Sequence, residues 1–480
     1  MTLNEKVGKY RWTICGLLFF ATTINYLDRQ VLSLTWKDFI APEFGWTNND
    51  YGNITALFSI FYAVSLLFAG RFVDWLDTKK GFLWAIGVWS FGACLHAFCG
   101  IATSGLLTGD WFVGFEGAKE AIKTVNNTAM VASTSVTLFI FARFILALGE
   151  AGNFPAAIKT TAEYFPKKDR AFSTSIFNAG ATVGALAAPI TVPFIAEAYG
   201  WEMAFLIIGA LGFVWMGFWV FMYEKPEKHK RVTQAELAYI QQDITAESKK
   251  IGYVPETVDK VSFIDCFKYK QTWAFAFGKF MTDGVWWFFL FWTPAYLSSV
   301  YKINSAEAAF PLFILYAITL LSIIGGWLPT YFVDKKGMNP YDGRMRSMLI
   351  FAFFPLLAMV AQPLGHLTYW LPVIIIGIAG AAHQAWSANI FTTVSDMFPK
   401  KAIATIVGIG GLAGGIGSTF IQKGSGLLFD YSKTTNMNFL GFKGIEAGYF
   451  IVFSVCSVCY LIGWVVMKAL VPEYKPITTL

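Results

Sequence analysis

Twelve long apolar runs constrain the fold of this 480-residue chain more than any other feature. A bilayer core of about 30 Å needs roughly 20 residues of helix to cross it, and every run is close to that length or longer. The runs lie at 12–36, 51–73, 81–100, 135–160, 170–196, 202–222, 272–298, 306–332, 347–364, 368–394, 402–424 and 446–470. The sequence therefore predicts an all-α polytopic membrane protein with twelve transmembrane helices.

Composition and charge agree with this prediction. The chain is 56% hydrophobic and only 14% charged, whereas a soluble domain carries about 25% charged residues. Most of the 37 Lys and Arg fall in alternate loops, and these loops become the cytoplasmic ones if both termini are cytoplasmic. The distribution of the positive charge thus indicates how the chain is oriented in a bacterial inner membrane, and it excludes nucleic-acid binding.

The sequence carries no pattern that indicates an enzyme or a bound cofactor. The six cysteines show no zinc spacing, and Cys456 and Cys459 lie inside an apolar run, where we expect them to pack. No GxxxxGK[ST] motif is present, so the chain has no nucleotide site of that kind. Any energy source must be an ion gradient or the gradient of the substrate itself.

The two halves of the chain resemble each other. The segment 163–168 recurs at 396–401, and the segment 72–74 recurs at 332–334. The first offset is shorter than the second, so the first half holds extra residues, which we expect to face outward. Two parallel repeats around a midplane site are typical of transporters. We expect six-helix bundles at 1–222 and 271–480, a cytoplasmic linker at 223–270, and the insertion at 102–134.

Local motifs identify the chain as similar to a known family. The segment 70–80 resembles the loop signature of the major facilitator superfamily, and 143–151 resembles its fourth-helix motif. With 25–29 in the first helix, the pattern is similar to the anion:cation symporter branch. Helix 7 and the segment 382–384 most resemble hexuronate transporters. Asp77 stands where the loop signature usually has Gly, and Gly411 stands where galactonate-type relatives tend to carry a polar side chain.

Charged residues inside the apolar runs need an explanation, because each costs about 2.5 to 3.5 kcal/mol at the bilayer centre. The basic residues Arg29, Arg143 and Lys279 are matched in number by acidic residues. Such groups face the bundle interior or a wet cavity and commonly mark a substrate path. The alternative is that they only pair to hold helices together. The acidic partners are Asp28, Glu150 and Asp283.

Arg29 is the candidate ligand for a carboxylate. Tyr26 lies three residues earlier, so both side chains project from one face of the helix. A guanidinium offers a planar pair of donors to a carboxylate, and a phenol adds a further donor. The alternative is a structural pair between Arg29 and an acid of helix 4.

Asp28 and Glu150 are the candidate proton-coupling residues. Glu150 lies about 20 Å from the cytoplasmic end of helix 4, near the midplane, and shares a face with Arg143. Such an acid can exchange its proton when the partner of the arginine changes from Glu150 to substrate. The family resemblance assigns both acids to coupling; the alternative is a permanent ion pair. Arg143 and Asp283 complete the predicted charge network.

Further candidate substrate contacts come from the repeat and from the resemblance. The offset of 233 residues places His383 opposite Glu150, although a lone histidine on an apolar helix is more often a core residue. Lys279 either supplies a second positive group or is neutralised by Asp283, four residues on. Trp286 and Trp287 stack on the sugar or pack in the core. The remaining candidates are Tyr62, Asn178, Gln384, Ser387 and Asn389.

A cytoplasmic gate is predicted from the repeated loop signature, the alternative being a solvated turn. Its residues are Asp74, Lys79, Lys80, Asp334, Lys335 and Lys336. The resulting hypothesis is a proton-coupled importer of a sugar-acid anion, a hexuronate such as glucuronate or galacturonate, which works as a monomer in the lipid bilayer without a cofactor. Alternatives are an aldonate, a keto-deoxy sugar acid or another organic anion, a polytopic membrane enzyme, or a non-transporting nutrient sensor.

Overall fold

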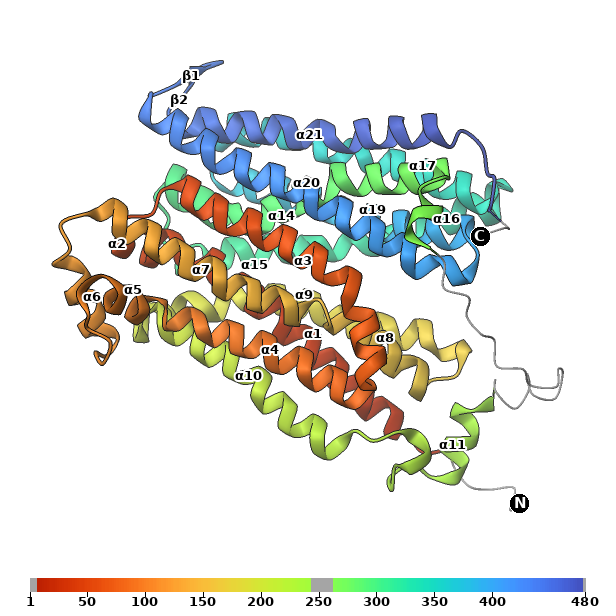
Figure 1. The fold of residues 1–480 in the computed structure, drawn as a ribbon. Helices are drawn as coiled ribbons and strands as arrows, with labels where there is room; N and C mark the ends of the chain where they lie inside the picture. Colours follow the sequence, from red (N-terminus) through yellow and green to blue (C-terminus); the bar gives the residue numbers. More distant parts are fainter. Residues whose placement is uncertain (1–6, 243–261, 478–480) are drawn as a thin grey trace.

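The computed structural model describes residues 7–242 and 262–477, which are almost entirely helical (Figure 1). The first part contains α1 (Tyr10–Thr35), η1 (Trp36–Ile40), α2 (Ala41–Phe44), α3 (Asn48–Leu76), α4 (Thr78–Ala97), α5 (Cys99–Thr108), α6 (Phe115–Lys123), α7 (Thr128–Glu150), α8 (Asn153–Tyr164), α9 (Lys167–Tyr199), α10 (Trp201–Met222), η2 (Pro226–Lys228) and α11 (Gln234–Ile240). The second part contains α13 (Phe263–Cys266), α14 (Lys270–Tyr301), α15 (Ala309–Ile318), η3 (Thr319–Ile323), α16 (Ile324–Lys336), α17 (Pro340–Phe353), η4 (Phe354–Val360), α18 (Ala361–Gly365), α19 (Trp370–Met397), α20 (Lys400–Thr434), the two-stranded ribbon β1 (Asn438–Phe439) and β2 (Phe442–Lys443), and α21 (Ile445–Leu470).

Each predicted apolar run coincides with a helix or with helices in series. Within the described residues, nine helices are long and apolar enough to cross a membrane, or ten if the bent pair α4 and α5 is one span. The predicted runs not among these ten are α1 and α14, which are 26 and 32 residues long. Both helices carry charges within their apolar sequence, which lowers their hydropathy. The count of twelve spans therefore stays a prediction.

A break in the helix places Glu150 at a helix end. Glu150 is the last residue of α7, and α8 begins three residues later at Asn153. Pro155 has no N–H to donate to the carbonyl of Ala151, so the hydrogen-bond ladder is interrupted there. The Glu150 side chain is nevertheless fully buried, with 0% exposure.

Glycines let the helices around the buried charges approach closely. A Cβ on Gly184 of α9 would lie 2.4 Å from the carbonyl oxygen of Thr23 in α1. A Cβ on Gly149 of α7 would lie 2.3 Å from the backbone nitrogen of Trp89 in α4. Small residues commonly serve this purpose in membranes. They bring α9 into close backbone contact with α1, and α7 into close backbone contact with α4.

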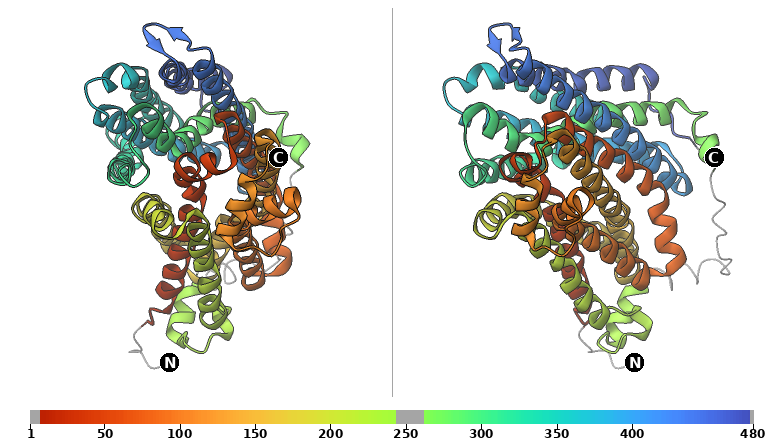
Figure 2. Two further views of the ribbon diagram at one scale, coloured as in Figure 1. Left: turned by 90° about the vertical axis from the view of Figure 1, so that its left-hand side faces the viewer. Right: turned by 60° about the vertical axis from the view of Figure 1, so that its left-hand side comes forward.

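The two parts of the chain touch at one end and diverge at the other (Figures 1 and 2). The insertion helix α6 and the β-ribbon lie at the end where they touch, which we call the insertion end. The start of α1, the end of α21 and α11 lie at the opposite end, which we call the terminal end. A set of hydrogen bonds between the two parts lies toward the insertion end.

These hydrogen bonds form what we call the seam, between α1–α3 and the residues around 298–305 and 418–430. The Asp430 carboxylate accepts from the backbone N–H groups of Asn48 (3.0 Å) and Asn49 (2.7 Å). Asp38 accepts from the backbone N–H of Ser305 at 2.7 Å. Each part thus supplies a carboxylate that binds backbone donors of the other part.

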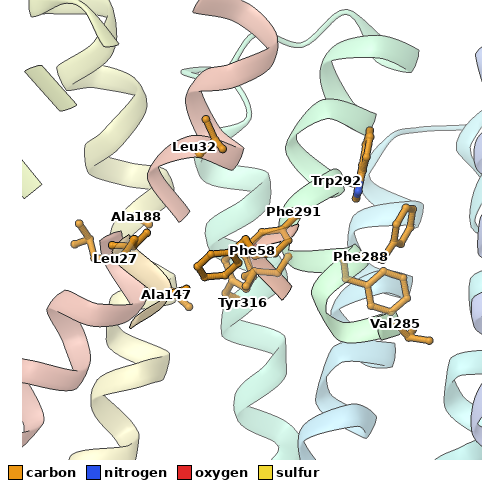
Figure 3. Packing of buried hydrophobic residues seen from close by; sticks show 14 of the residues in the cluster. Leu27, Leu32, Phe58, Ala147, Ala188, Val285, Phe288, Phe291, Trp292 and Tyr316 are labelled. Atoms are coloured by element: carbon orange, nitrogen blue, oxygen red, sulfur yellow. The ribbon is translucent and has the colours of Figure 1, made fainter. Parts of the chain in front are cut away.

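An aromatic plug lies beside the seam. The rings of Trp36 and Tyr51 are stacked with centroids 4.1 Å apart, and the ring of Trp292 packs edge-on against both. Phe58 lies close to Phe291 between the helices (Figure 3). The plug joins residues from both parts of the chain, so it fills the space between them at this level.

The cytoplasmic linker predicted at 223–270 is described only in part, because 243–261 lie outside the described residues. Thr233 accepts a hydrogen bond from the backbone N–H of Glu236, as a capping residue does. The Glu236 carboxylate does not complete a capping box, because it accepts from the backbone and side chain of Arg11. The short helix α11 is thereby fixed to the beginning of α1.

Candidate functional site

The pair Arg29–Glu150 is the centre of the candidate site. Arg29 of α1 is 4% exposed and Glu150 of α7 is fully buried. The Nε and Nη2 groups of Arg29 donate to Oε2 of Glu150 at 2.9 and 2.7 Å. Both donors thus bind the same oxygen, and Oε1 has no hydrogen-bond partner among the described residues.

Three aromatic rings surround the Arg29 guanidinium and form what we call the aromatic cage. Its carbon Cζ lies 5.1 Å from the ring centroid of Tyr26, 4.7 Å from that of Tyr62 and 5.2 Å from that of Trp287. A cation over the face of an aromatic ring is attracted by the ring quadrupole. Trp287 belongs to α14, so the cage joins the two parts of the chain.

Two further buried charges lie in the first part of the chain. Arg143 of α7 is 3% exposed, its guanidinium lies 5.2 Å from the ring centroid of Phe58, and its Nη1 has no partner in the described residues. Asp28 is 2% exposed, and neither carboxyl oxygen has a hydrogen-bond partner in the same residues. Glu150 forms its hydrogen bonds with Arg29 and none with Arg143.

Lys279 and Asp283 of α14 form an ion pair. Their Nζ and Oδ2 atoms are 2.7 Å apart, and Nζ also lies 4.3 Å from the ring centroid of Phe391. Gly414 of α20 makes room for this pair, because a Cβ there would lie 2.2 Å from Oδ2 of Asp283. In this structure Lys279 is therefore neutralised by its helical neighbour, one of the two alternatives that the sequence left open.

His383 of α19 lies in an aromatic setting of its own. Its ring stacks on Trp286 with centroids 5.4 Å apart and an interplanar angle of 1°. Its Nδ1 lies 2.8 Å from the hydroxyl oxygen of Tyr460 in α21. Trp286 and Trp287 are successive residues of α14, so this helix contacts Arg29 on one side and His383 on another.

The other predicted contacts are less closely grouped. Asn389 donates to the carbonyl oxygens of Gly325 and Ala385, each at 2.8 Å, so its amide joins α19 to α16. Gln384 and Ser387 are half-buried on α19. Asn178 is exposed on α9. Geometry thus brings together Tyr26, Arg29, Tyr62, Glu150 and Trp287 in one cluster, and Trp286, His383 and Tyr460 in a second.

The first half of the predicted gate lies around the turn between α3 and α4, which forms ion pairs with residues just after α10. Lys79 pairs with Glu224 at 3.2 Å, and Asp77 pairs with Lys225 at 3.1 Å. Burial acts to raise the pKa of Asp77, but hydrogen bonds from Lys225 and the Thr78 backbone outweigh it and lower that pKa. Asp77 has a φ of 71°, a value that favours glycine, the usual residue here in the resembling signature.

The rest of the predicted gate makes no comparable network in the described residues. The side chain of Asp74 lies outside the described part of the structure. Lys80 is exposed, and Asp334, Lys335 and Lys336 are exposed at the end of α16. In the second part, ion pairs at this end join other residues, among them Arg344 with Asp396 at 2.5 Å and Lys468 with Asp342 at 3.2 Å.

Sequence reasoning missed Phe58 and Tyr460. Both are aromatic residues inside apolar runs that contain many other aromatic residues, so composition gave no signal for either. Only the packing of α3 and α21 shows that Phe58 lies under Arg143 and that Tyr460 contacts His383. The described residues contain no group of three or more His, Cys, Asp or Glu placed to hold a metal ion.

Comparison with known proteins decides the family. The model of the Major Facilitator Superfamily matches residues 18–421. The chain belongs to the Major Facilitator Superfamily. The resemblance inferred from the sequence motifs is thereby confirmed, and the protein is a multi-pass membrane protein.

Individual superfamily members are similar along most of the chain. The hexuronate transporter of Escherichia coli (strain K12) is 28% identical over 431 residues, which cover 89% of each chain. The probable galactarate/D-glucarate transporter GarP of the same strain is 24% identical, covering 95% of this chain and 96% of that one. A crystal structure of a bacterial homologue of the human lysosomal transporter Spinster matches with a TM-score of 0.69 at 17% identity, over 97% of this chain and 98% of that one.

Proposed function

We propose that this protein imports a sugar-acid anion, a hexuronate such as glucuronate or galacturonate, together with protons. The observation that carries the proposal is the buried Arg29, held by one oxygen of Glu150 inside an aromatic cage built from both parts of the chain. The names of the hexuronate and galactarate/D-glucarate relatives support the substrate class.

Substrate binding and proton uptake are linked through Arg29. An arginine offers two parallel donors to a carboxylate and cannot give up its own proton. When the sugar carboxylate occupies these donors, Glu150 loses its hydrogen bonds in a fully buried position. A buried carboxylate without a partner is costly, so Glu150 takes up a proton at this step. Asp28, which has no hydrogen-bond partner in the described residues, is the second coupling acid.

Proton coupling also meets the electrical requirement for import. Each net charge that crosses the membrane is worth about 2.3 kcal/mol per 100 mV. An inside-negative potential therefore opposes the entry of an anion. One co-transported proton cancels its charge, and a second makes the potential favour import.

The cycle proceeds by alternating access between bundles 1–222 and 271–480, joined by the linker 223–270. In this proposal α1 and α14 are the two spans that bring the total to twelve, the insertion end faces outward, and both termini are cytoplasmic. The seam and the plug close the outward path in the present conformation. The two parts diverge toward the terminal end (Figure 1), so the described state is the one that releases substrate inward.

The test is uptake of labelled hexuronates into proteoliposomes under an imposed pH gradient. We expect wild type to accumulate the label, Arg29→Ala to lose binding, and Glu150→Gln to retain exchange but lose accumulation driven by the gradient. Lys159→Gln, outside the cage, is the control for the loss of a basic residue. Unchanged accumulation by Glu150→Gln would contradict the coupling role, and preferred uptake of an aldonate or keto-deoxy sugar acid would reassign the substrate.

A further inference from the structure

The insertion begins where α4 reaches the edge of the lipid core. Lys80 is exposed in the first turn of α4, at the terminal end. At about 1.5 Å per residue, the 20 residues of α4 cover about 30 Å, the thickness of the core. Phe98, the residue after α4, therefore lies near the boundary of the core at the insertion end. The next helix, α5, starts at the following residue and is bent by 53° from α4, so it runs obliquely along this boundary.

The loop that follows α5 folds back to the level of Phe98. Phe115, the first residue of α6, has its ring centroid 6.0 Å from that of Phe98. The indole of Trp111 lies against α5 at Gly105, where a Cβ would lie 2.3 Å from the ring. The loop 109–114 therefore lies at the edge of the lipid core, where α5 and α6 are side by side (Figure 1).

Three apolar side chains are exposed in this part of the insertion. Phe112 is fully exposed, and Leu106 and Trp111 are about half exposed. Moving a phenylalanine side chain out of water is worth about 1.5 to 3 kcal/mol. A partner that takes up these side chains would therefore be bound favourably.

The charged side chains nearby have partners of their own. Asp110 accepts a hydrogen bond from the hydroxyl of Thr108 at 2.9 Å. On α6, Lys119 pairs with Glu202 of α10 at 3.2 Å. Such groups are compatible with the polar headgroup layer, which begins at the boundary of the core.

The exposed side chains continue the lipid-facing surface of α4. Trp84, Phe91 and Phe98 are exposed and follow one another at intervals of seven residues, so they lie on one face of the helix. In a multi-pass membrane protein, an exposed aromatic face of this kind contacts lipid. Phe98, at the end of this face, packs near Phe115, so the lipid-facing surface leads directly to the insertion.

We propose that the insertion is a membrane anchor: Leu106, Trp111 and Phe112 enter the lipid leaflet at the insertion end, at the boundary between acyl chains and headgroups. Tryptophan is enriched at this boundary because its ring combines an apolar body with a polar N–H. The ion pair between Lys119 and Glu202 joins the anchor to the start of α10, so the anchor fixes the depth of the first part of the chain in the bilayer. The inference concerns the insertion and does not depend on the proposed function.

The test measures the surroundings of a nitroxide spin label attached to Phe112→Cys in the full-length protein, reconstituted in liposomes. Oxygen concentrates in the hydrocarbon and a neutral nickel chelate stays in water, so their collision rates with the label distinguish lipid from water. The matched control is Glu120→Cys on α6, where the native side chain is 71% exposed and paired with Lys123. We expect the ratio of oxygen to nickel collisions to be several times higher at position 112 than at position 120.

The labelled variant is expected to fold, because Phe112 is fully exposed and its replacement leaves the packing intact. The six native cysteines are buried or half-buried, so the unsubstituted protein treated with the same reagent gives the background signal. A label at position 112 that meets the nickel chelate as readily as the control does would place the loop in water and overturn the inference. A label shielded from both reagents would also overturn it, because protein, such as a second copy of this chain, would then cover the loop in place of lipid.

Discussion

At the residue scale, the contacts that Arg29 forms with Glu150 and with the aromatic cage depend on the shape of its side chain as well as on its charge. Its Nε and Nη2 groups both donate to one carboxylate oxygen, and three ring faces surround the same planar group. A lysine carries the same charge as a compact ammonium group that cannot form a planar fork. The substitution therefore separates geometry from charge.

Arg29→Lys is expected to weaken substrate binding by about tenfold or more while the protein stays folded. The affinity is measured from substrate-induced thermal stabilisation of the purified protein. The Lys159→Gln variant provides the comparison, because it changes a basic residue outside the cage. An affinity equal to that of wild type would show that charge alone suffices at this position.

Asp77→Gly tests the strain in the turn between α3 and α4. Asp77 has a φ of 71°, which a glycine adopts at little cost. Its ion pair with Lys225 joins two side chains that are about half exposed, so losing the pair costs little. We expect Asp77→Gly to raise Tm by about 1 to 2 °C, and Asp77→Ala, which keeps the strain, to lower it.

At the element scale, the sequence predicted the positions of the helices well, because a long apolar run that crosses a bilayer has to form a helix to satisfy its backbone hydrogen bonds. It also predicted that Arg29 and a helix 4 acid meet, since buried charges need partners. It could not predict which side chains near the site turn toward it. Asn389 was expected to contact substrate, but its side-chain amide donates a hydrogen bond to the carbonyl oxygen of Gly325 and so links α19 to α16. The direction of this side chain depends on the rotation of α19 about its axis, which is set by packing with several other helices.

The contact between α3 and α20 provides a prediction about the seam. A Cβ on Gly426 would lie 2.7 Å from the carbonyl oxygen of Asn48, so Gly426→Val should force the two helices apart. A cysteine at Ser418, which faces Ser59 at 3.0 Å, should then react several times faster with a thiol reagent added from the insertion end. Gly424→Val is the control, because a Cβ there meets nothing within 4 Å.

At the scale of the whole molecule, the insertion end has a titrating group of its own. Glu43 of α2 accepts a hydrogen bond from Trp201 Nε1 at 2.8 Å. Burial raises the pKa of Glu43 to about 7, with a smaller contribution from Glu202, while the bond from Trp201 and the charge of Lys119 oppose the shift. The folded protein thus holds this proton more tightly than the unfolded chain does.

The sign of the pH effect follows from this difference. The contribution of Glu43 is most favourable at low pH, declines as pH rises above the unfolded value of 4.5, and levels off above about 7. We expect Glu43→Gln to raise Tm by about 2 °C or more at pH 8 and to leave it unchanged near pH 4. A Tm difference that is the same at both pH values would exclude Glu43 as the source.

In the proposed import cycle, the neighbouring positions of Trp286 and Trp287 would also limit the size of the substrate. The two residues follow each other on α14, so their side chains leave the helix about 100° apart and contact different partners, Arg29 and His383. A sugar acid that contacts both tryptophans must reach from one to the other, so in this proposal an acid much shorter than a six-carbon sugar would contact only one of them.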